Sequence, residues 1–216
     1  MRLLAISIFF SCAIIACSKA KRDVPQSIDL PFYNDPNFTP EWISQDEPRF
    51  DSIHTIAPFK FVNQNGDTIS NEDFDGKVYA TNFFFSICPN VCPKMKKSLS
   101  LVQDAYQNDE RVKILSHTVM PWVDSVARLK EYAQLNDINE EKWHLVTGDK
   151  NAIYNMARTS YFADEGFDKT VTSEEDFLHT ENVILIDQKR RIRGVYNGTL
   201  SLEMKRMMED IDTLLK

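Results

Sequence analysis

Two cysteines in the segment Phe85-Ser86-Ile87-Cys88-Pro89-Asn90-Val91-Cys92-Pro93 are the residues best suited to chemistry. The chain has four cysteines, and the other two, Cys12 and Cys17, lie in an apolar N-terminal segment. We therefore expect no structural disulfide framework in the folded domain. Two neighbouring soft thiolates favour binding of Cu(I) or Zn(II), or thiol–disulfide exchange.

A predicted strand and a predicted helix position these cysteines. Residues 77–85 are rich in Val, Tyr, Thr and Phe, which is typical of a buried strand, and apolar residues recur at helical spacing from Pro93 to about 107. Because proline is tolerated at the first helical position, we expect the helix to begin with Cys92 near its cap and Cys88 in the preceding loop. Both sulfurs would then lie at the positive end of the helix dipole, which stabilises thiolates.

Two sulfurs leave a metal ion with an incomplete set of ligands, so we expect a third ligand among the four histidines. His179 is the preferred candidate, because it precedes a predicted strand over 182–186. In a thioredoxin topology that turn lies opposite the helix that carries the cysteines. His117 ends a predicted strand at the same edge of the sheet and is a weaker candidate. His54 and His144 are expected to be packing or surface residues.

The order of the predicted elements, a βαβ unit followed by a β-hairpin and a terminal helix, predicts an α/β domain with a thioredoxin-like, three-layer fold, preceded by an N-terminal hairpin and an extended N-terminal arm. Alternating strands and helices also fit other three-layer α/β folds, and the position of the cysteines just past a buried strand favours the thioredoxin-like one. The predicted hairpin turns at Asn65-Gly66, a pair that favours a type I′ turn. Other predicted elements are strands over 112–118 and 143–147, helices over 124–135 and 152–158 (the second capped by Asp149), a hairpin over 182–186 and 192–196, and a helix from 201 to about 216. An acidic loop insertion is predicted over 163–176.

The N-terminal residues indicate export. Arg2 precedes a short apolar run that ends in Ile14-Ile15-Ala16-Cys17, which resembles a bacterial lipobox. We interpret residues 1–16 as a lipoprotein signal peptide and Cys17 as the lipidation site. The alternative is an ordinary signal peptide with an incidental cysteine. With Cys17 lipidated, the domain would be lipid-anchored to a membrane and lie in the periplasm or another extracytoplasmic space.

Residues 17–53 are predicted to form an extended linker or arm, followed by the folded domain over 54–216. Five of the nine prolines fall in this arm, and they disfavour regular structure. Four aromatic residues are candidates for attaching it to the domain: Phe32, Tyr33, Phe38 and Trp42. The formal net charge of -7 argues against a nucleic-acid partner, which requires clustered Lys and Arg.

The chain resembles the SCO1/SenC family in three stretches: Asp75-Gly76-Lys77 through Cys88 to Pro93, then Trp143-His144-Leu145-Val146-Thr147-Gly148, then His179 before an apolar strand. The resemblance runs from about Phe59 to the C-terminus. It implies a thioredoxin fold that binds copper through Cys88, Cys92 and His179. It also implies a role in assembling the CuA centre of cytochrome oxidase. The implied partner is an oxidase subunit or another copper or thiol client.

The sequence departs from that family in two places. Leu178 stands where many members have an acidic residue. The segment Ser116-His117-Thr118-Val119-Met120-Pro121-Trp122-Val123-Asp124 replaces the common Ser-Val-Asp-Pro-x-x-Asp. An outer carboxylate that would orient a ligand is therefore expected to be missing, and His117 or Met120 would alter the rim of the site.

Functions other than copper delivery are also compatible with parts of this sequence. A thiol-disulfide oxidoreductase that reduces client cysteines would use Cys88 and Cys92 as a redox pair, although dithiol oxidoreductases usually have Cys-x-x-Cys. A peroxidase of the peroxiredoxin type is disfavoured, because Phe85 stands where a Thr or Ser would precede the reactive cysteine. A copper sensor is not separated from a copper chaperone by the sequence. A classical metabolic enzyme is not expected.

Overall fold

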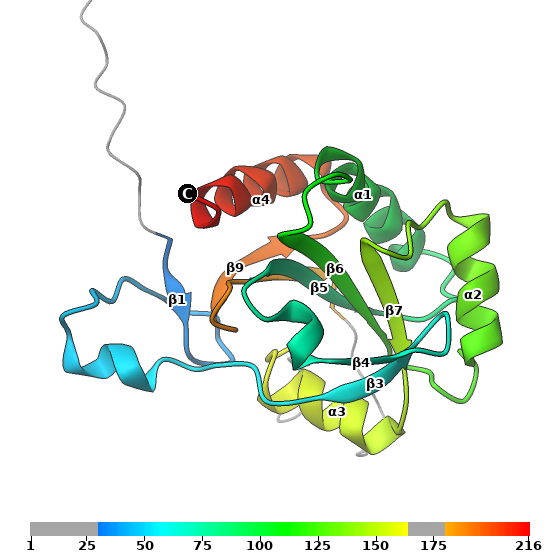
Figure 1. Cartoon of the computed structure of the whole chain (residues 1–216), viewed down its shortest axis with the longest axis horizontal. Helices are drawn as coiled ribbons and strands as arrows, with labels where there is room; N and C mark the ends of the chain where they lie inside the picture. The colour runs from blue at the N-terminus through cyan, green and yellow to red at the C-terminus, as the bar shows by residue number, and fades with distance from the viewer. Residues whose placement is uncertain (1–29, 164–179) are drawn as a thin grey trace, which may run out of the picture.

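The computed structural model describes residues 30–163 and 180–216, and it confirms the predicted α/β order (Figure 1). A seven-stranded sheet has the order β4-β3-β7-β6-β5-β8-β9. Its strands are β3 (Lys60–Asn63), β4 (Thr68–Ser70), β5 (Val78–Phe84), β6 (Val112–Thr118), β7 (Trp143–Thr147), β8 (Asn182–Ile186) and β9 (Ile192–Asn197). The helices are α1 (Val91–Ala105), α2 (Val126–Leu135), α3 (Lys150–Thr159) and α4 (Ser201–Leu214).

Strand β5 is the point at which the chain changes direction across the sheet. Strands β6 and β7 follow it in parallel on one side, whereas β8 pairs with it in antiparallel fashion on the other side. Crossovers between parallel strands are right-handed, so α1 and α2 cover the same face. Helix α4 packs on that face as well, and α3 packs on the opposite face. Ligand sites of open α/β sheets lie beyond the carboxyl end of such a strand, where the cysteines are found.

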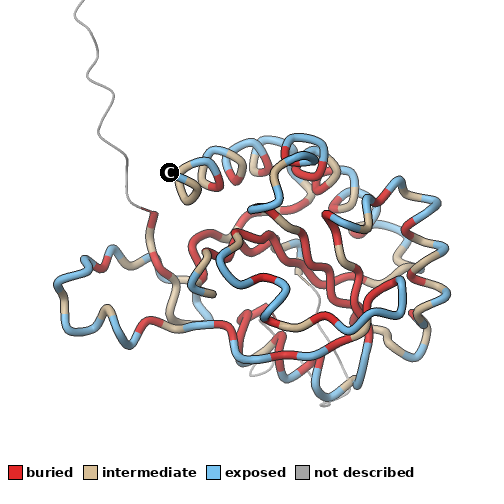
Figure 2. The backbone as a smooth tube through the Cα atoms, in the orientation of Figure 1, coloured by how far each residue is buried: buried red, intermediate tan, exposed pale blue. Residues whose placement is uncertain are grey.

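The core consists of two apolar layers, one on each face of the sheet, and the strands between them are almost wholly buried (Figure 2). All seven residues of β5 are buried, which explains why polar and apolar residues do not alternate along it. No helix within residues 30–163 and 180–216 has both the length and the apolar character required to cross a membrane.

The first hairpin differs from its prediction. Gly66 has a positive φ of 86°, but Asn65 does not, whereas a type I′ turn requires positive φ at both central residues. The N–H of Gly66 bonds to the carbonyl of Asn63, and the N–H of Asn63 bonds to the carbonyl of Asp67. The loop is therefore longer than a two-residue turn. The side chain of Asn63, which accepts from the N–H groups of Asn65 and Asp67, stabilises it.

The described part of the arm docks on the domain, as predicted, and it lies beside β9, but it also contains short regular elements. These are β1 (Phe32–Tyr33), β2 (Pro40–Glu41) and the 3-10 helix η1 (Pro48–Ser52). Arg193 holds the arm, since its guanidinium donates to the carbonyls of Leu30 and Pro31 and lies 4.0 Å from the centroid of the Phe32 ring. Trp42 was a predicted anchor, but 59% of it is exposed.

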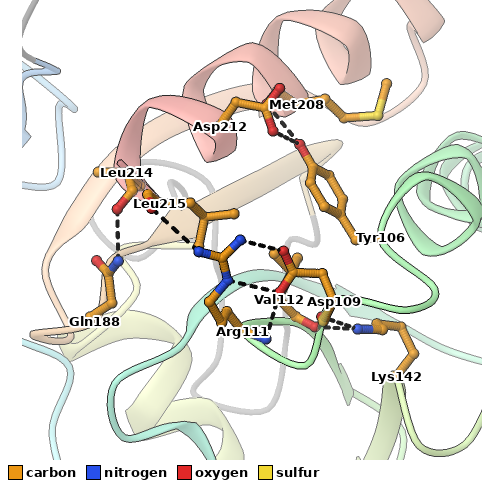
Figure 3. A network of polar contacts seen from close by, with 10 residues as sticks. All are labelled: Tyr106, Asp109, Arg111, Val112, Lys142, Gln188, Met208, Asp212, Leu214 and Leu215. Atoms are coloured by element: carbon orange, nitrogen blue, oxygen red, sulfur yellow. Dashed lines mark hydrogen bonds and ion pairs between the residues drawn. The ribbon is translucent and has the colours of Figure 1, made fainter.

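A polar network lies at the amino-terminal ends of β5 and β6 (Figure 3), whereas the cysteines follow the carboxyl end of β5. Lys142 donates to the carbonyls of Asp109 and Val112, and Tyr106 donates to Asp212 on α4. The neighbouring Arg111 guanidinium lowers the pKa of Asp109 to about 2. This network joins α4 to the strand ends through Tyr106 and Arg111.

Candidate metal centre

Both cysteines lie at the start of α1, but the helix begins earlier than predicted. Its cap is Asn90, so Cys92 is the second helical residue and Pro93 the third. The first four N–H groups of a helix have no partner within it, so a proline at the third position costs no hydrogen bond. The prediction placed Pro93 first and was therefore two residues late. Cys88 lies in the preceding loop, as predicted.

Cys88 is the accessible and more acidic thiol. It is half-buried, and burial raises its pKa. However, the N–H groups of Cys92, Asn90 and Val91, together with the Cys92 thiol, outweigh that effect, so the pKa of Cys88 lies below its usual range. The Cys92 N–H donates to the Cys88 sulfur over 3.4 Å. This is the stabilisation at a helix N-terminus that the sequence predicted for Cys88.

Cys92 behaves differently, and the prediction of a stabilised thiolate at this position was wrong. Only 3% of the residue is exposed, and burial raises the pKa of its thiol to about 12. The neighbouring Cys88 raises it further. Cys88 and Cys92 therefore form an unequal pair. Cys88 ionises more readily, whereas Cys92 stays protonated until a metal ion displaces its proton. Both are free thiols in the structure.

A buried carboxylate that the sequence did not reveal as functional holds the loop that carries Cys88. Asp124 is fully buried and accepts the N–H of Ser86 over 3.1 Å, the hydroxyl of Ser86 over 2.5 Å and the hydroxyl of Thr118 over 2.5 Å. Arg128 adds a bond to the Ser86 hydroxyl over 3.2 Å. The sequence signal of this network is a polar residue at the carboxyl end of each strand, Ser86 just after β5 and Thr118 at the end of β6.

His179, the preferred third ligand, lies outside the described residues. The chain resumes at Thr180, whose hydroxyl lies 3.5 Å from the carbonyl of Ala163. Because β8 is antiparallel to β5, its first residue, Asn182, lies toward the carboxyl end of β5, which is the end that leads to Cys88. Within residues 30–163 and 180–216, no three His, Cys, Asp or Glu side chains are grouped as a metal site requires.

The structure excludes His117 as a ligand. It is fully buried in an aromatic cluster, stacked on Phe83 with ring centroids 5.1 Å apart and edge-on to Phe61. That cluster packs on the α3 face, whereas Cys92 belongs to the layer on the other face. Neither ring nitrogen has a hydrogen-bond partner among the described residues, and burial lowers the pKa of His117 to about 3, so the imidazole is neutral. The sequence places His117 at the correct end of its strand, but it does not show which face of the sheet the side chain points to, because adjacent side chains along a strand point to opposite faces.

The two other described histidines and Met120, which was predicted to alter the rim of the site, pack against neighbouring side chains or backbone groups. His144 lies on β7 beside Phe74, and burial lowers its pKa to about 4. His54 bonds through Nε2 to the Ser160 carbonyl over 2.7 Å and so attaches the arm to the end of α3, which confirms a packing role. Met120 is half-buried and packs against the apolar layer on the α3 face of the sheet.

Comparison with known proteins identifies the family. The SCO1/SenC family model matches residues 48–216. The chain belongs to the SCO1/SenC family. A curated relative, the SCO1 protein homolog of Bacillus subtilis, is 25% identical over 162 residues, which cover 73% of this chain and 81% of the relative.

Solved structures of SCO1/SenC proteins confirm the thioredoxin-like fold. BsSco, a member of the Sco family of cytochrome c oxidase assembly proteins, is 25% identical with a TM-score of 0.64, over 76% of this chain and 96% of that one. ScoI of Bradyrhizobium japonicum, solved with copper bound, is 25% identical with a TM-score of 0.58, over 74% of this chain and 99% of that one.

Proposed function

We propose that this SCO1/SenC protein binds copper through Cys88, Cys92 and His179 and delivers it for assembly of a cytochrome c oxidase copper centre. The observation that carries the proposal is the unequal thiol pair at the N-terminus of α1, beside the edge at which the chain re-enters the sheet after His179. Two sulfurs and one imidazole suit Cu(I). The relative with bound copper supports the choice of metal.

The unequal pair gives an order of binding. Cys88 ionises first and captures the incoming ion. The ion then displaces the proton of buried Cys92, because metal binding requires the thiolate, and one proton is released for each thiol that binds. Asp124 keeps Ser86, and with it the Cys88 loop, in place during this exchange. An acceptor's thiolates would remove the copper by replacing these ligands one at a time.

We also propose that the protein acts outside the cytoplasm on a lipid anchor. Residues 1–16 would be removed as a signal peptide, Cys17 would carry the lipid, and residues 17–53 would connect it to the domain. All of residues 1–29 lie outside the described part of the chain. The assignment rests on the apolar run and the lipobox-like Ile14-Ile15-Ala16-Cys17.

Copper binding is tested by replacing His179. After loading with Cu(I) and desalting, the wild-type protein should retain one equivalent of copper, and His179→Ala should lose tight binding because an imidazole ligand is gone. His144→Ala is the matched control, since His144 lies on β7 away from the cysteines, and it should retain copper. Metal analysis gives the stoichiometry. Equal retention by His179→Ala and the wild type would exclude His179 as a ligand.

A second function, thiol-disulfide exchange, is favoured by the same inequality of the thiols. The Cys88 thiolate would attack a client disulfide, and the Cys92 thiolate would then attack the Cys88 sulfur of the mixed disulfide. The client would leave as a dithiol, and the domain would keep the Cys88–Cys92 disulfide. Reduction of an oxidised client by His179→Ala at the wild-type rate would favour this function, because exchange needs no metal ligand.

A further inference from the structure

We propose that the rim around Cys88 is a docking surface for a folded acceptor protein, with Ile87 and Trp122 as apolar anchors and Lys94 and Lys150 as contacts for acidic groups. The inference rests on the proposed delivery of copper and names the surface through which the acceptor is recognised. Ile87 precedes Cys88 in the chain and is exposed, so it lies on the surface that a protein taking an ion from Cys88 would approach.

Two large apolar side chains are exposed on two neighbouring loops at this edge. Ile87 is 51% exposed on the loop after β5, and Trp122 is 60% exposed on the loop after β6. The loops are joined by the bond from the Ser86 N–H to Asp124 and by the bond from the Val119 N–H to the Phe84 carbonyl, 2.9 Å long. The anchors are thus held by the same buried network that holds Cys88.

The position of Trp122 is also restrained at its ring. The ammonium of Lys150, the first residue of α3, lies 5.5 Å from the Trp122 centroid and 5.3 Å from that of Tyr154. A side chain that is already restrained loses little entropy when a partner covers it. Tryptophan is also among the residues that contribute most to binding energy at protein interfaces.

The charges at the rim indicate the chemistry of the partner. The chain has a net charge of -7, yet Lys94 in the first turn of α1 and Lys150 at the start of α3 have no ion pair among the described residues. Asp124, the acid within the loop after β6, is buried and bonded to Ser86, while Glu131 pairs with Arg128 and Asp149 caps α3. An acceptor with acidic side chains beside its own metal-binding thiols would complement this surface.

The test compares two tryptophans of equal exposure. Trp122 is 60% exposed at the rim, and Trp42 is 59% exposed on the arm. Copper-loaded wild type, Trp122→Ala and Trp42→Ala are mixed with the reduced, copper-free CuA domain of a cytochrome c oxidase, and the transfer rate is measured. We expect Trp122→Ala to transfer copper about tenfold more slowly or worse, and Trp42→Ala to match the wild type.

Transfer to a small chelator separates docking from metal binding. Bathocuproine disulfonate requires no protein surface, so all three proteins should lose copper to it at the same rate. Added salt should slow transfer to the CuA domain for the wild type, since Lys94 and Lys150 act through charge. Unchanged transfer to the CuA domain by Trp122→Ala would overturn the docking surface and leave copper binding by Cys88, Cys92 and His179 intact.

Two other occupants give different results. If the patch instead bound a membrane, Trp122→Ala would bind less to vesicles of phosphatidylcholine and phosphatidylglycerol and would still transfer copper normally. If it bound a second copy of this chain, Trp122→Ala would lower the sedimentation coefficient without slowing transfer. Either result would overturn the proposal. Loss of copper from His179→Ala tests the proposed function separately.

Discussion

Iodoacetamide at neutral pH should modify Cys88 at least about 30-fold faster than Cys92 in the reduced, metal-free protein. The pKa of Cys88 lies below the ordinary value of 9.0, and burial raises that of Cys92 to about 12. A gap of at least three pKa units corresponds to about a thousandfold difference in thiolate fraction. The Cys92 thiolate is the more basic one and therefore the stronger nucleophile, which offsets part of this difference. The expected ratio of the two modification rates is then roughly 30 or more.

Peptide mapping by mass spectrometry follows both sites in one sample, so no variant is required. The rate at Cys88 should reach its plateau at a lower pH than that of a free cysteine, because the neighbouring N–H groups stabilise the thiolate. The rate at Cys92 should still rise with pH throughout the alkaline range. Modification of both cysteines at similar rates would contradict the unequal pair and, with it, the proposed order of copper capture.

Replacing Asp124 by alanine should lower the free energy of unfolding by about 3–5 kcal/mol, because bonds to a buried carboxylate are worth about 1.5–3 kcal/mol each and the buried donors lose their partner. Two of these donors come from Ser86 and one from Thr118. Asp124→Asn should cost less, since its amide oxygen still accepts. Urea denaturation measures both.

The matched control is Asp149→Ala. Asp149 also precedes a helix and accepts one N–H, that of Ala152 over 2.8 Å, but it is exposed. The loss of an exposed cap costs about 1 kcal/mol. If Asp124→Ala were no more destabilising than Asp149→Ala, the carboxylate would not be holding the loop, and the Cys88 geometry would depend on other contacts.

Local patterns predicted most of the fold. The bounds of β6, β7 and β8 agree with the predicted strands, because runs of apolar residues between turn signals define buried strands closely. The Asp149 cap was predicted and is present. The errors lie where a local pattern is compatible with two structures. Proline fits the third helical position as well as the first, so the start of α1 was misplaced. Asn-Gly fits more than one kind of hairpin loop, so the turn type was wrong.

The site was only partly predictable because burial depends on the whole fold. Cys-x3-Cys located the thiols, but the difference between Cys88 and Cys92 arises from the 3% exposure of Cys92, which no spacing reveals. His117 lies at the correct end of the sheet and on the wrong face of it. Asp124 is linked to Ser86 across 38 positions of sequence, and such contacts follow only from the pairing of β5 with β6.

The most direct test of the central claim is X-ray absorption at the copper edge of the reduced, Cu(I)-loaded protein. We predict a first shell of two sulfurs and one nitrogen, with the outer scattering of an imidazole that disappears in His179→Ala. A shell without the sulfur pair, or an imidazole signal that persists in His179→Ala, would contradict the proposed copper site.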